Sequence, residues 1–448
     1  MPTPVAADIP FAPRRLPFFY GWAILGFGTL GILASTPGQT IGVSTFTDHL
    51  IDALGLQRQT LSLAYAIGTA ASSLLLTYAG KLYDRFGARV MGVLTPLALS
   101  VVLVALSQAD RIAAPLGGAL APQRPWVAAF AVMVVGFFAL RFTGQGVLTM
   151  VSRNMMLKWF DRHRGLAVGI SGVFVAVGFS LTPLIFAALL DGWGWRGAWL
   201  WAAAVVGPAT AALAAVFFRD NPEQCGLVPD GHAPPPHPHD TPGPPAAVME
   251  QYTLGQARRC FAFWVFAVAI AMFALYITGL MFHIDSIFAE AGMGKNAGRS
   301  IFLPAAVLSL LFRLLAGWIS DHVPLKYLLM VFLGGMAGTM FGFLYLEQQW
   351  TIWLIIAGNG VSLAMMDLLS GMVWPRFFGR EHLGAISGQA MAVAVLFSAV
   401  GPYLFAISLD WTASYDAAAG ACLGAIAVLM ALSPLANNPQ AGRAGAGL

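Results

Sequence analysis

The chain has 448 residues, of which 58% are hydrophobic and only 10% are charged, and its formal net charge is +4. A soluble domain carries about 25% charged residues, so this composition excludes a water-soluble globular protein and predicts a protein embedded in a lipid bilayer. The three cysteines are scattered without metal-ligand spacing, which argues against a disulfide framework and a cysteine-based metal centre.

Apolar stretches long enough to cross a membrane recur along the whole chain. A transmembrane helix needs about 20 apolar residues, and twelve stretches meet this requirement. We therefore expect an all-α membrane protein with twelve transmembrane helices. In chain order the stretches are 17–37, 60–80, 90–108, 126–148, 164–189, 196–218, 260–283, 299–320, 326–347, 350–373, 384–408 and 414–437.

Basic residues are distributed unevenly between the predicted loops. With both termini in the cytoplasm, sixteen of the 24 Lys and Arg residues lie on the cytoplasmic side and six on the other, while Arg141 and Arg313 lie inside spans. Because cytoplasmic loops carry an excess of Lys and Arg, we expect a multi-pass protein of the cell (inner) membrane with cytoplasmic N- and C-termini. The positive net charge reflects this topology, so we expect no nucleic-acid partner.

The first distinctive polar segment follows the second span and reads G-x-L-x-D-R-x-G-x-R. Gly87 allows a tight cytoplasmic turn. Asp84 is suited to capping a neighbouring helix N-terminus and to pairing with arginines, so that one face is held closed. The segment therefore predicts a cytoplasmic gate motif. Its residues are Gly80, Asp84, Arg85, Gly87 and Arg89, and Asp321 stands at the corresponding place after the eighth span.

The two halves of the chain repeat short segments. Residues 80–84 recur as 317–321, and residues 169–172 recur as 385–388. Many transporters consist of two six-helix units that are related by a pseudo-twofold axis, with the substrate-binding site between them. The predicted domains are an N-terminal six-helix half (1–218), a partly disordered cytoplasmic linker (219–259) and a C-terminal six-helix half (260–448).

The linker is the longest polar stretch, and its segment 231–246 is rich in Pro and His. Pro at this density favours an extended conformation and does not pack into a core. His232, His237 and His239 have no Cys or carboxylate ligands beside them, so we expect no metal there.

Three segments carry a family resemblance. Residues 80–89 resemble the loop 2–3 signature of the major facilitator superfamily. Trp159–Gly169, with its aromatic pair, basic residues and small residues at helical spacing, is similar to the loop 4–helix 5 signature of the monocarboxylate-transporter and oxalate–formate antiporter branch. Phe19–Trp22 resembles the Gly-Trp motif of the same branch. The resemblance implies a secondary transporter that works by alternating access. Independently, small residues on α-helices allow two helices to approach closely.

A lone arginine lies in the eighth span. Placing Arg at mid-bilayer depth costs about 2.5–3.5 kcal/mol, so Arg313 is expected to face a cavity or a partner. Its planar guanidinium is suited to binding a carboxylate. The resemblance implies the same role, because an Arg at the matching position binds the substrate carboxylate in that family. Ser309 stands where many proton-coupled members have an acidic residue; this departs from the usual proton site and leaves a hydroxyl that can donate to a substrate oxygen.

Two further residues are candidates for proton coupling. Asp367 is the only carboxylate in the interior of a predicted span. It lies seven residues before Trp374 near the cytoplasmic end of its span, and Arg313 lies eight residues before Asp321, so the two residues are at nearly the same depth. If the two residues pair, protonation of Asp367 would free Arg313 for an anion; the alternative is a structural ion pair. His283, at the outer end of the seventh span, is either a gate that titrates near neutral pH or an interfacial residue.

Other polar residues inside the spans could complete a binding site. Arg141 is either a second cation that faces the cavity or an arginine satisfied by backbone carbonyls and Gln145. Polar side chains in a helix bundle also serve as contacts between helices. The remaining candidates for substrate binding are Gln39, Tyr276 and Asn359.

These observations predict a secondary active transporter of a small organic anion, with a monocarboxylate as the favoured substrate and proton symport as the favoured coupling. The partners expected are the anion, protons and the lipid bilayer, with no cofactor and no metal. The alternatives are a proton-coupled exporter of amphipathic or drug-like compounds and a membrane sensor that does not transport. No nucleophile–base pair is visible in the sequence, so an enzyme is not expected.

Overall fold

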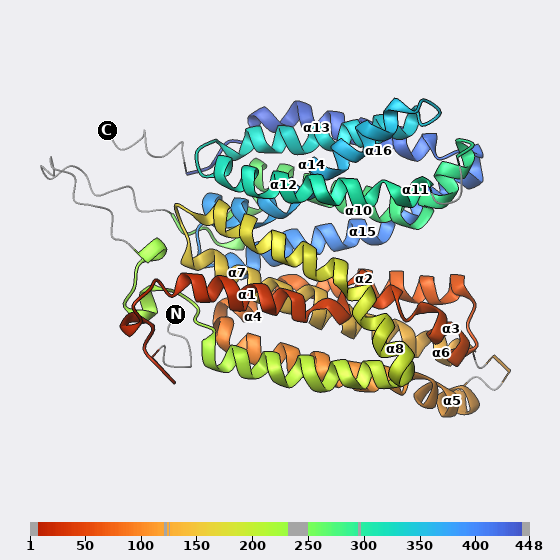
Figure 1. The fold of residues 1–448 in the computed structure, drawn as a ribbon, viewed down its shortest axis with the longest axis horizontal. Helices are drawn as coiled ribbons and strands as arrows, with labels where there is room; N and C mark the ends of the chain where they lie inside the picture. Colours follow the sequence, from red (N-terminus) through yellow and green to blue (C-terminus); the bar gives the residue numbers. More distant parts are fainter. Residues whose placement is uncertain (1–7, 121–122, 125, 232–249, 294–296, 441–448) are drawn as a thin grey trace, which may run out of the picture. The chain divides into compact units, whose positions relative to one another are not determined.

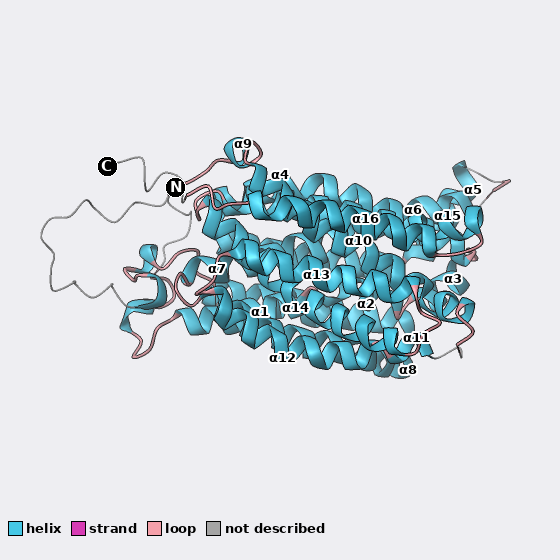
Figure 2. Ribbon diagram, turned by 90° about the horizontal axis from the view of Figure 1, so that it is seen from above, coloured by secondary structure: helices cyan, strands magenta, loops and turns pink. Residues whose placement is uncertain are grey.

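Every regular element in the described part of the chain is helical. The computed structural model describes residues 8–120, 123–124, 126–231, 250–293 and 297–440 (Figure 1). Within these ranges the regular elements are α-helices, short 3₁₀ helices and one π-helical segment, and Figure 2 shows no strand among them. The prediction of an all-α protein is therefore confirmed.

The chain forms two compact units, and each is described by itself. Unit 1 comprises residues 1–159 and 174–233, and unit 2 comprises residues 160–173 and 234–448. The helices that begin in unit 1 are α1 (Gly21–Ala34), α2 (Thr40–Ser44), α3 (Thr47–Leu54), α4 (Arg58–Ser107), α5 (Ala109–Leu120), α6 (Trp126–Leu140), the π-helical segment (Arg141–Leu148) and α7 (Thr149–Trp159). Helix α8 (Arg164–Phe217) begins in unit 2 and continues into unit 1.

Unit 2 contains the remaining helices. These are α9 (Leu254–Ala257), α10 (Phe261–Glu290), α11 (Ala297–Ser300), α12 (Phe302–Ser320), α13 (Leu325–Leu344), α14 (Trp350–Phe378), α15 (Leu383–Thr412) and α16 (Asp416–Leu432). The 3₁₀ helices of the whole described chain are η1 (Pro13–Arg15), η2 (Thr36–Gly38), η4 (Glu223–Cys225), η5 (Pro229–Gly231) and η6 (Ser433–Leu435).

Nine helices among the described residues are long and apolar enough to cross a membrane. Two of them, α4 with 50 residues and α8 with 54, are much longer than one crossing requires. Each is interrupted by a glycine with a left-handed backbone, Gly87 (φ 80°) in α4 and Gly194 (φ 64°) in α8. Only glycine adopts such a conformation without steric cost. Each long helix therefore consists of two segments, as the sequence predicted.

The first predicted span is shorter in the structure than in the sequence analysis. Helix α1 has 14 residues, and η2 and α2 follow it rather than a continuation of the same helix. The twelve-helix count therefore stays a prediction at this span. The segment between the third and fourth spans also differs from a simple loop, because it contains α5, whose Ala109 and Ala113 are buried in the core of unit 1.

The outward surfaces of the helices are apolar. Leu74, Val101, Leu303 and Leu311 are large hydrophobic residues with most of their surface exposed. Water would disfavour this arrangement, whereas hydrocarbon chains solvate it. These surfaces support the assignment of a membrane protein.

Candidate functional site

Arg313 and Asp367 form an ion pair inside unit 2. Nη1 of Arg313, on α12, donates to Oδ2 of Asp367, on α14. Arg313 is only 7% exposed, whereas the Asp367 side chain is 30% exposed. The sequence left open whether these two residues pair, and the structure shows that they do. The carboxylate neutralises the guanidinium and is also the more accessible partner.

A glycine-lined surface of α8 lies against Arg313. A Cβ added at Gly172 would lie 2.9 Å from Nη1 of Arg313, and one added at Gly169 would lie 2.9 Å from the Arg313 carbonyl oxygen. Both distances are shorter than ordinary contacts with a Cβ. The sequence predicted that these small residues allow a close helix approach, and the structure shows that the approaching helix is α12.

The guanidinium of Arg313 keeps an unused donor. Its Nε is buried and has no hydrogen-bond partner among the described residues. The hydroxyl of Ser309, one turn earlier on α12, donates to the Ala306 carbonyl at 2.9 Å. A buried donor without a partner is costly, so Arg313, while paired with Asp367, can still donate from Nε to a further acceptor.

Arg141 is a second buried cation, and it lies in unit 1. It is 3% exposed, and its Nη1 donates to the Gly38 carbonyl at 3.0 Å and to Oγ1 of Thr40 at 3.3 Å. Its guanidinium also lies over the Tyr65 ring, 5.4 Å from the centroid. Within the described chain no carboxylate forms an ion pair with Arg141, and its Nε has no partner. Contact with a backbone carbonyl was one of the two alternatives that the sequence left open, whereas the π-helical backbone at Arg141 and the aromatic contact were not anticipated.

Three other predicted site residues, Gln39, Tyr276 and Asn359, lie in two different environments. Gln39 hydrogen-bonds Oγ of Ser35 at 2.9 Å and Oγ1 of Thr149 at 3.2 Å, in the same region of unit 1 as the Arg141 contacts. Tyr276 and Asn359 are completely buried in unit 2. The Asn359 amide atoms have no hydrogen-bond partner within the described ranges, whereas the Tyr276 hydroxyl interacts with Ser362 and Thr339.

His283 forms contacts near the C-terminal end of α10. One ring nitrogen lies 3.0 Å from the Pro402 carbonyl oxygen, and the other lies 3.2 Å from the Tyr415 hydroxyl. These contacts join His283 to α15 and to the beginning of α16. A role in proton coupling stays a prediction.

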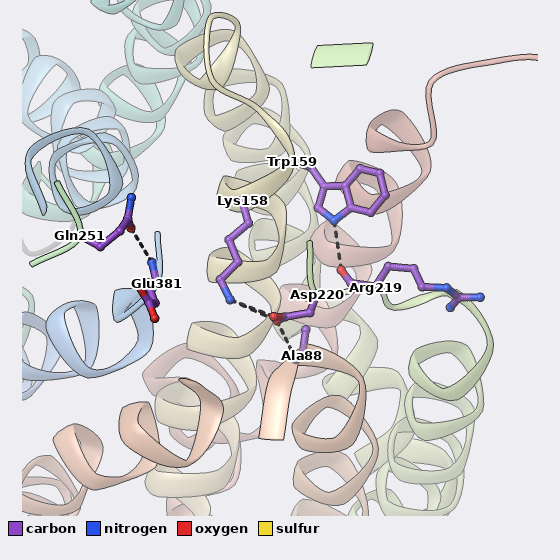
Figure 3. Close-up of polar contacts among 7 residues, drawn as sticks. All are labelled: Ala88, Lys158, Trp159, Arg219, Asp220, Gln251 and Glu381. Carbon is purple, nitrogen blue, oxygen red and sulfur yellow. Dashed lines mark hydrogen bonds and ion pairs between the residues drawn. The ribbon is translucent and has the colours of Figure 1, made fainter. Parts of the chain in front are cut away.

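The turn of the gate motif is held by a residue that the sequence did not single out. Asp220 accepts a hydrogen bond from the Ala88 amide at 3.1 Å, directly after the Gly87 turn, and from Nζ of Lys158 at 3.1 and 3.2 Å (Figure 3). The Trp159 indole donates to the Arg219 carbonyl at 3.1 Å in the same cluster (Figure 3). The left-handed turn at Gly87 is confirmed. In the sequence, the only indication of this role is that Asp220 is an acidic residue two positions after the end of a predicted span.

Other gate residues have identified contacts as well. Arg89 donates from Nε to the Phe218 carbonyl at 3.0 Å, and the Arg85 guanidinium lies over the Phe86 ring. Gly80 is buried inside α4. A capping role for Asp84 stays a prediction.

Asp321 caps the beginning of α8 within unit 2. Its carboxylate accepts from the Gly165 amide at 2.9 Å and from the Leu166 amide at 3.4 Å. The N-terminus of a helix has unpaired amides and a positive potential, so a carboxylate is stabilised there. Burial nevertheless raises the pKa of Asp321, against the opposing effects of these amides and of the Arg376 charge. Asp321 is thus an ionisable helix cap, and its role in a gate stays a prediction.

Metal chemistry finds no support in the described ranges. No group of three or more His, Cys, Asp or Glu residues is arranged there to hold a metal ion. The linker histidines His232, His237 and His239 lie outside the described residues.

Comparison with known proteins agrees with this architecture. Residues 27–402 match the model of the Major Facilitator Superfamily. Monocarboxylate transporter 11 of Mus musculus is 29% identical over 307 residues, which cover 65% of this chain and 63% of that protein. The chain thus spans slightly less than two thirds of that relative's length.

Two solved structures share the fold at low sequence identity. The Escherichia coli fucose:proton symporter FucP gives a TM-score of 0.65 at 10% identity, covering 94% of this chain and 100% of that one. The proton:xylose symporter XylE gives a TM-score of 0.60 at 17% identity, covering 93% and 94%.

The described residues form helices, and nine of these are long and apolar enough to cross a membrane, which defines a polytopic helical membrane protein. The family match is the decisive finding: the chain belongs to the major facilitator superfamily and resembles its monocarboxylate-transporter branch.

Proposed function

We propose that this protein moves a small organic anion, specifically a monocarboxylate, across the cell membrane together with a proton. The observation on which the proposal rests is the buried Arg313–Asp367 pair. The similarity to proteins named monocarboxylate transporters supports the same substrate class. The proposal also includes cytoplasmic termini, and alternating access by the halves 1–218 and 260–448 about the linker 219–259.

The pair offers a direct means of coupling. When Asp367 is ionised, it occupies the guanidinium and neutralises it. Protonation removes that charge and weakens the hydrogen bond, because charge-assisted bonds are about twice as strong as neutral ones. A carboxylate substrate can then take the place of Asp367 on Nη1 and also accept from the unused Nε. One proton and one monovalent anion bind together, so the transport step is electroneutral.

Separating Asp367 from Arg313 with no other anion in its place would be costly. Breaking a buried ion pair by deleting one partner costs about 3–5 kcal/mol, since the remaining charge is uncompensated. Exchange of one carboxylate for another avoids this cost. In this proposal Arg313 therefore releases Asp367 only when a substrate is bound, which prevents leakage of protons without substrate.

The remaining predicted site residues have supporting roles in this proposal. Ser309 turns its hydroxyl from the Ala306 carbonyl to a substrate oxygen by rotating one bond. Arg141, with Gln39 nearby, provides a second positive potential that attracts the anion. Tyr276 and Asn359 bind water or substrate when the helices move, and His283 relays protons at its end of α10.

The test is uptake of labelled lactate into proteoliposomes with and without an inward proton gradient. Arg313→Lys should abolish most of the gradient-driven uptake, because a lysine retains the charge but lacks the planar fork. The matched control is Arg58→Lys, which changes the exposed Arg58–Asp48 pair in the same chemical way.

The controls decide between the candidate functions. Uptake by Arg313→Lys equal to that of the Arg58→Lys control would refute carboxylate binding by Arg313. If the folded wild type takes up no lactate or other monocarboxylate but extrudes amphipathic compounds against a proton gradient, the substrate class is wrong.

A further inference from the structure

We propose that a cavity at the start of α13 binds the phosphate group of an anionic phospholipid, a site separate from the Arg313–Asp367 pair. The cavity has a volume of about 660 Å³, within the range of small-molecule sites. Its walls come from the start of α13, the end of α14 and the segment after η6. Lys326 and Arg376 are its two charged lining residues, and both are cations.

The hydrogen bonds of these two cations do not neutralise them. Nζ of Lys326 donates to Oδ1 of Asn437 at 2.8 Å, and Nη1 of Arg376 donates to the Ser320 carbonyl at 2.6 Å. Both acceptors are neutral. Arg376 does act on the charge of Asp321, but that carboxylate does not line the cavity and accepts from the amides at the start of α8. The cavity therefore keeps a positive potential.

The backbone adds to this potential. Helix α13 begins at Leu325, and its preceding residue, Pro324, provides no side-chain cap. The first amides of a helix are unpaired and lie at its positive end. Leu325 and Lys326 line the cavity, so both the helix end and the cationic side chains favour a phosphate.

The position of the cavity favours a lipid over a soluble anion. Trp318, near the end of α12, is 60% exposed, and Tyr327, near the start of α13, is 52% exposed. Exposed aromatic residues at helix ends are typical of the membrane–water interface. Leu325 and Phe377 give the cavity apolar walls beside its cations, which suits a phosphate attached to glycerol and acyl chains. Basic pockets of this kind on the cytoplasmic side of membrane proteins bind anionic headgroups.

The test is native mass spectrometry of the full-length protein in detergent, with phosphatidylglycerol or phosphatidylcholine of identical acyl chains added. We expect the wild type to retain phosphatidylglycerol preferentially. Lys326→Gln should weaken this retention about fivefold, since one basic residue contributes about that factor at a membrane surface. Lys326→Arg should restore it. Arg259→Gln, which removes an exposed cation just before α10 and outside the cavity, is the matched control and should leave retention unchanged.

Three results would overturn the proposal. The first is equal retention of the two lipids by the wild type. The second is retention by Lys326→Gln that matches the Arg259→Gln control. The third is displacement of the lipid by inorganic phosphate at equal concentration, which would assign the cavity to a soluble anion. None of these results depends on transport activity, so the proposal stands or falls separately from the proposed function.

Discussion

Gly172 lies directly against the Arg313 guanidinium, so Gly172→Ala is a sensitive test of the candidate site. The added Cβ would lie 2.9 Å from Nη1, whereas ordinary contacts with a Cβ begin at 3.4 Å. The guanidinium must therefore withdraw by about 0.5 Å. A misplacement of 1 Å costs about 100-fold where reacting groups must align, so we expect coupled uptake to fall about tenfold.

The protein should tolerate this change without losing its fold. The atom that must move is the end of a flexible side chain, and Ala is better than Gly inside a helix by about 0.5–1 kcal/mol. The matched control is Gly334→Ala on α13, because a Cβ there meets nothing within 4 Å.

The assay is initial-rate uptake into proteoliposomes under an inward proton gradient, with the thermal midpoint of each variant measured in parallel. Equal uptake by Gly172→Ala and Gly334→Ala would refute the reasoning, because the guanidinium position would then not matter. A collapse of the thermal midpoint in Gly172→Ala would show that the contact is structural instead.

Three further predictions concern Asp367, Asp321 and Lys158. Asp367→Asn should keep anion exchange but lose its dependence on pH; unchanged pH dependence in exchange assays would place the proton elsewhere. Because burial raises the pKa of Asp321 above that of an exposed carboxyl, the folded state binds its proton more tightly. The thermal midpoint of the wild type minus that of Asp321→Asn should therefore fall as the pH rises from about 4 through this raised pKa. A difference that stays constant over this pH range would contradict the prediction. Lys158→Met leaves Asp220 buried without its cation and should cost about 3–5 kcal/mol, whereas removing both charges should cost less; additive losses would show that the pair is not coupled.

Part of the candidate site could be predicted from the sequence where depth in the membrane or local residue type decides it. Counting residues to the ends of two apolar spans placed Arg313 and Asp367 at similar depths and made a pair possible, but the sequence did not decide whether the pair forms. The close approach at Gly169 and Gly172 followed from small residues at helical spacing, and the Gly87 turn followed from the conformational freedom of glycine.

The features that were missed depend on contacts between distant parts of the chain. Asp220 contacts Lys158 and Ala88, which are 62 and 132 residues away. No local pattern specifies such partners. The sequence also could not show that Gly38 supplies a carbonyl to Arg141, because that contact depends on the break between α1 and α2 and on a π-helical backbone.

The central claim is that protonation of Asp367 frees Arg313 for an anion. The most direct measurement is proton uptake by the purified protein when lactate binds in weakly buffered solution near neutral pH. We expect the wild type to take up about one proton for each anion bound. We expect Asp367→Asn to bind the anion without taking up a proton. Lactate binding by the wild type with no proton uptake would contradict the account.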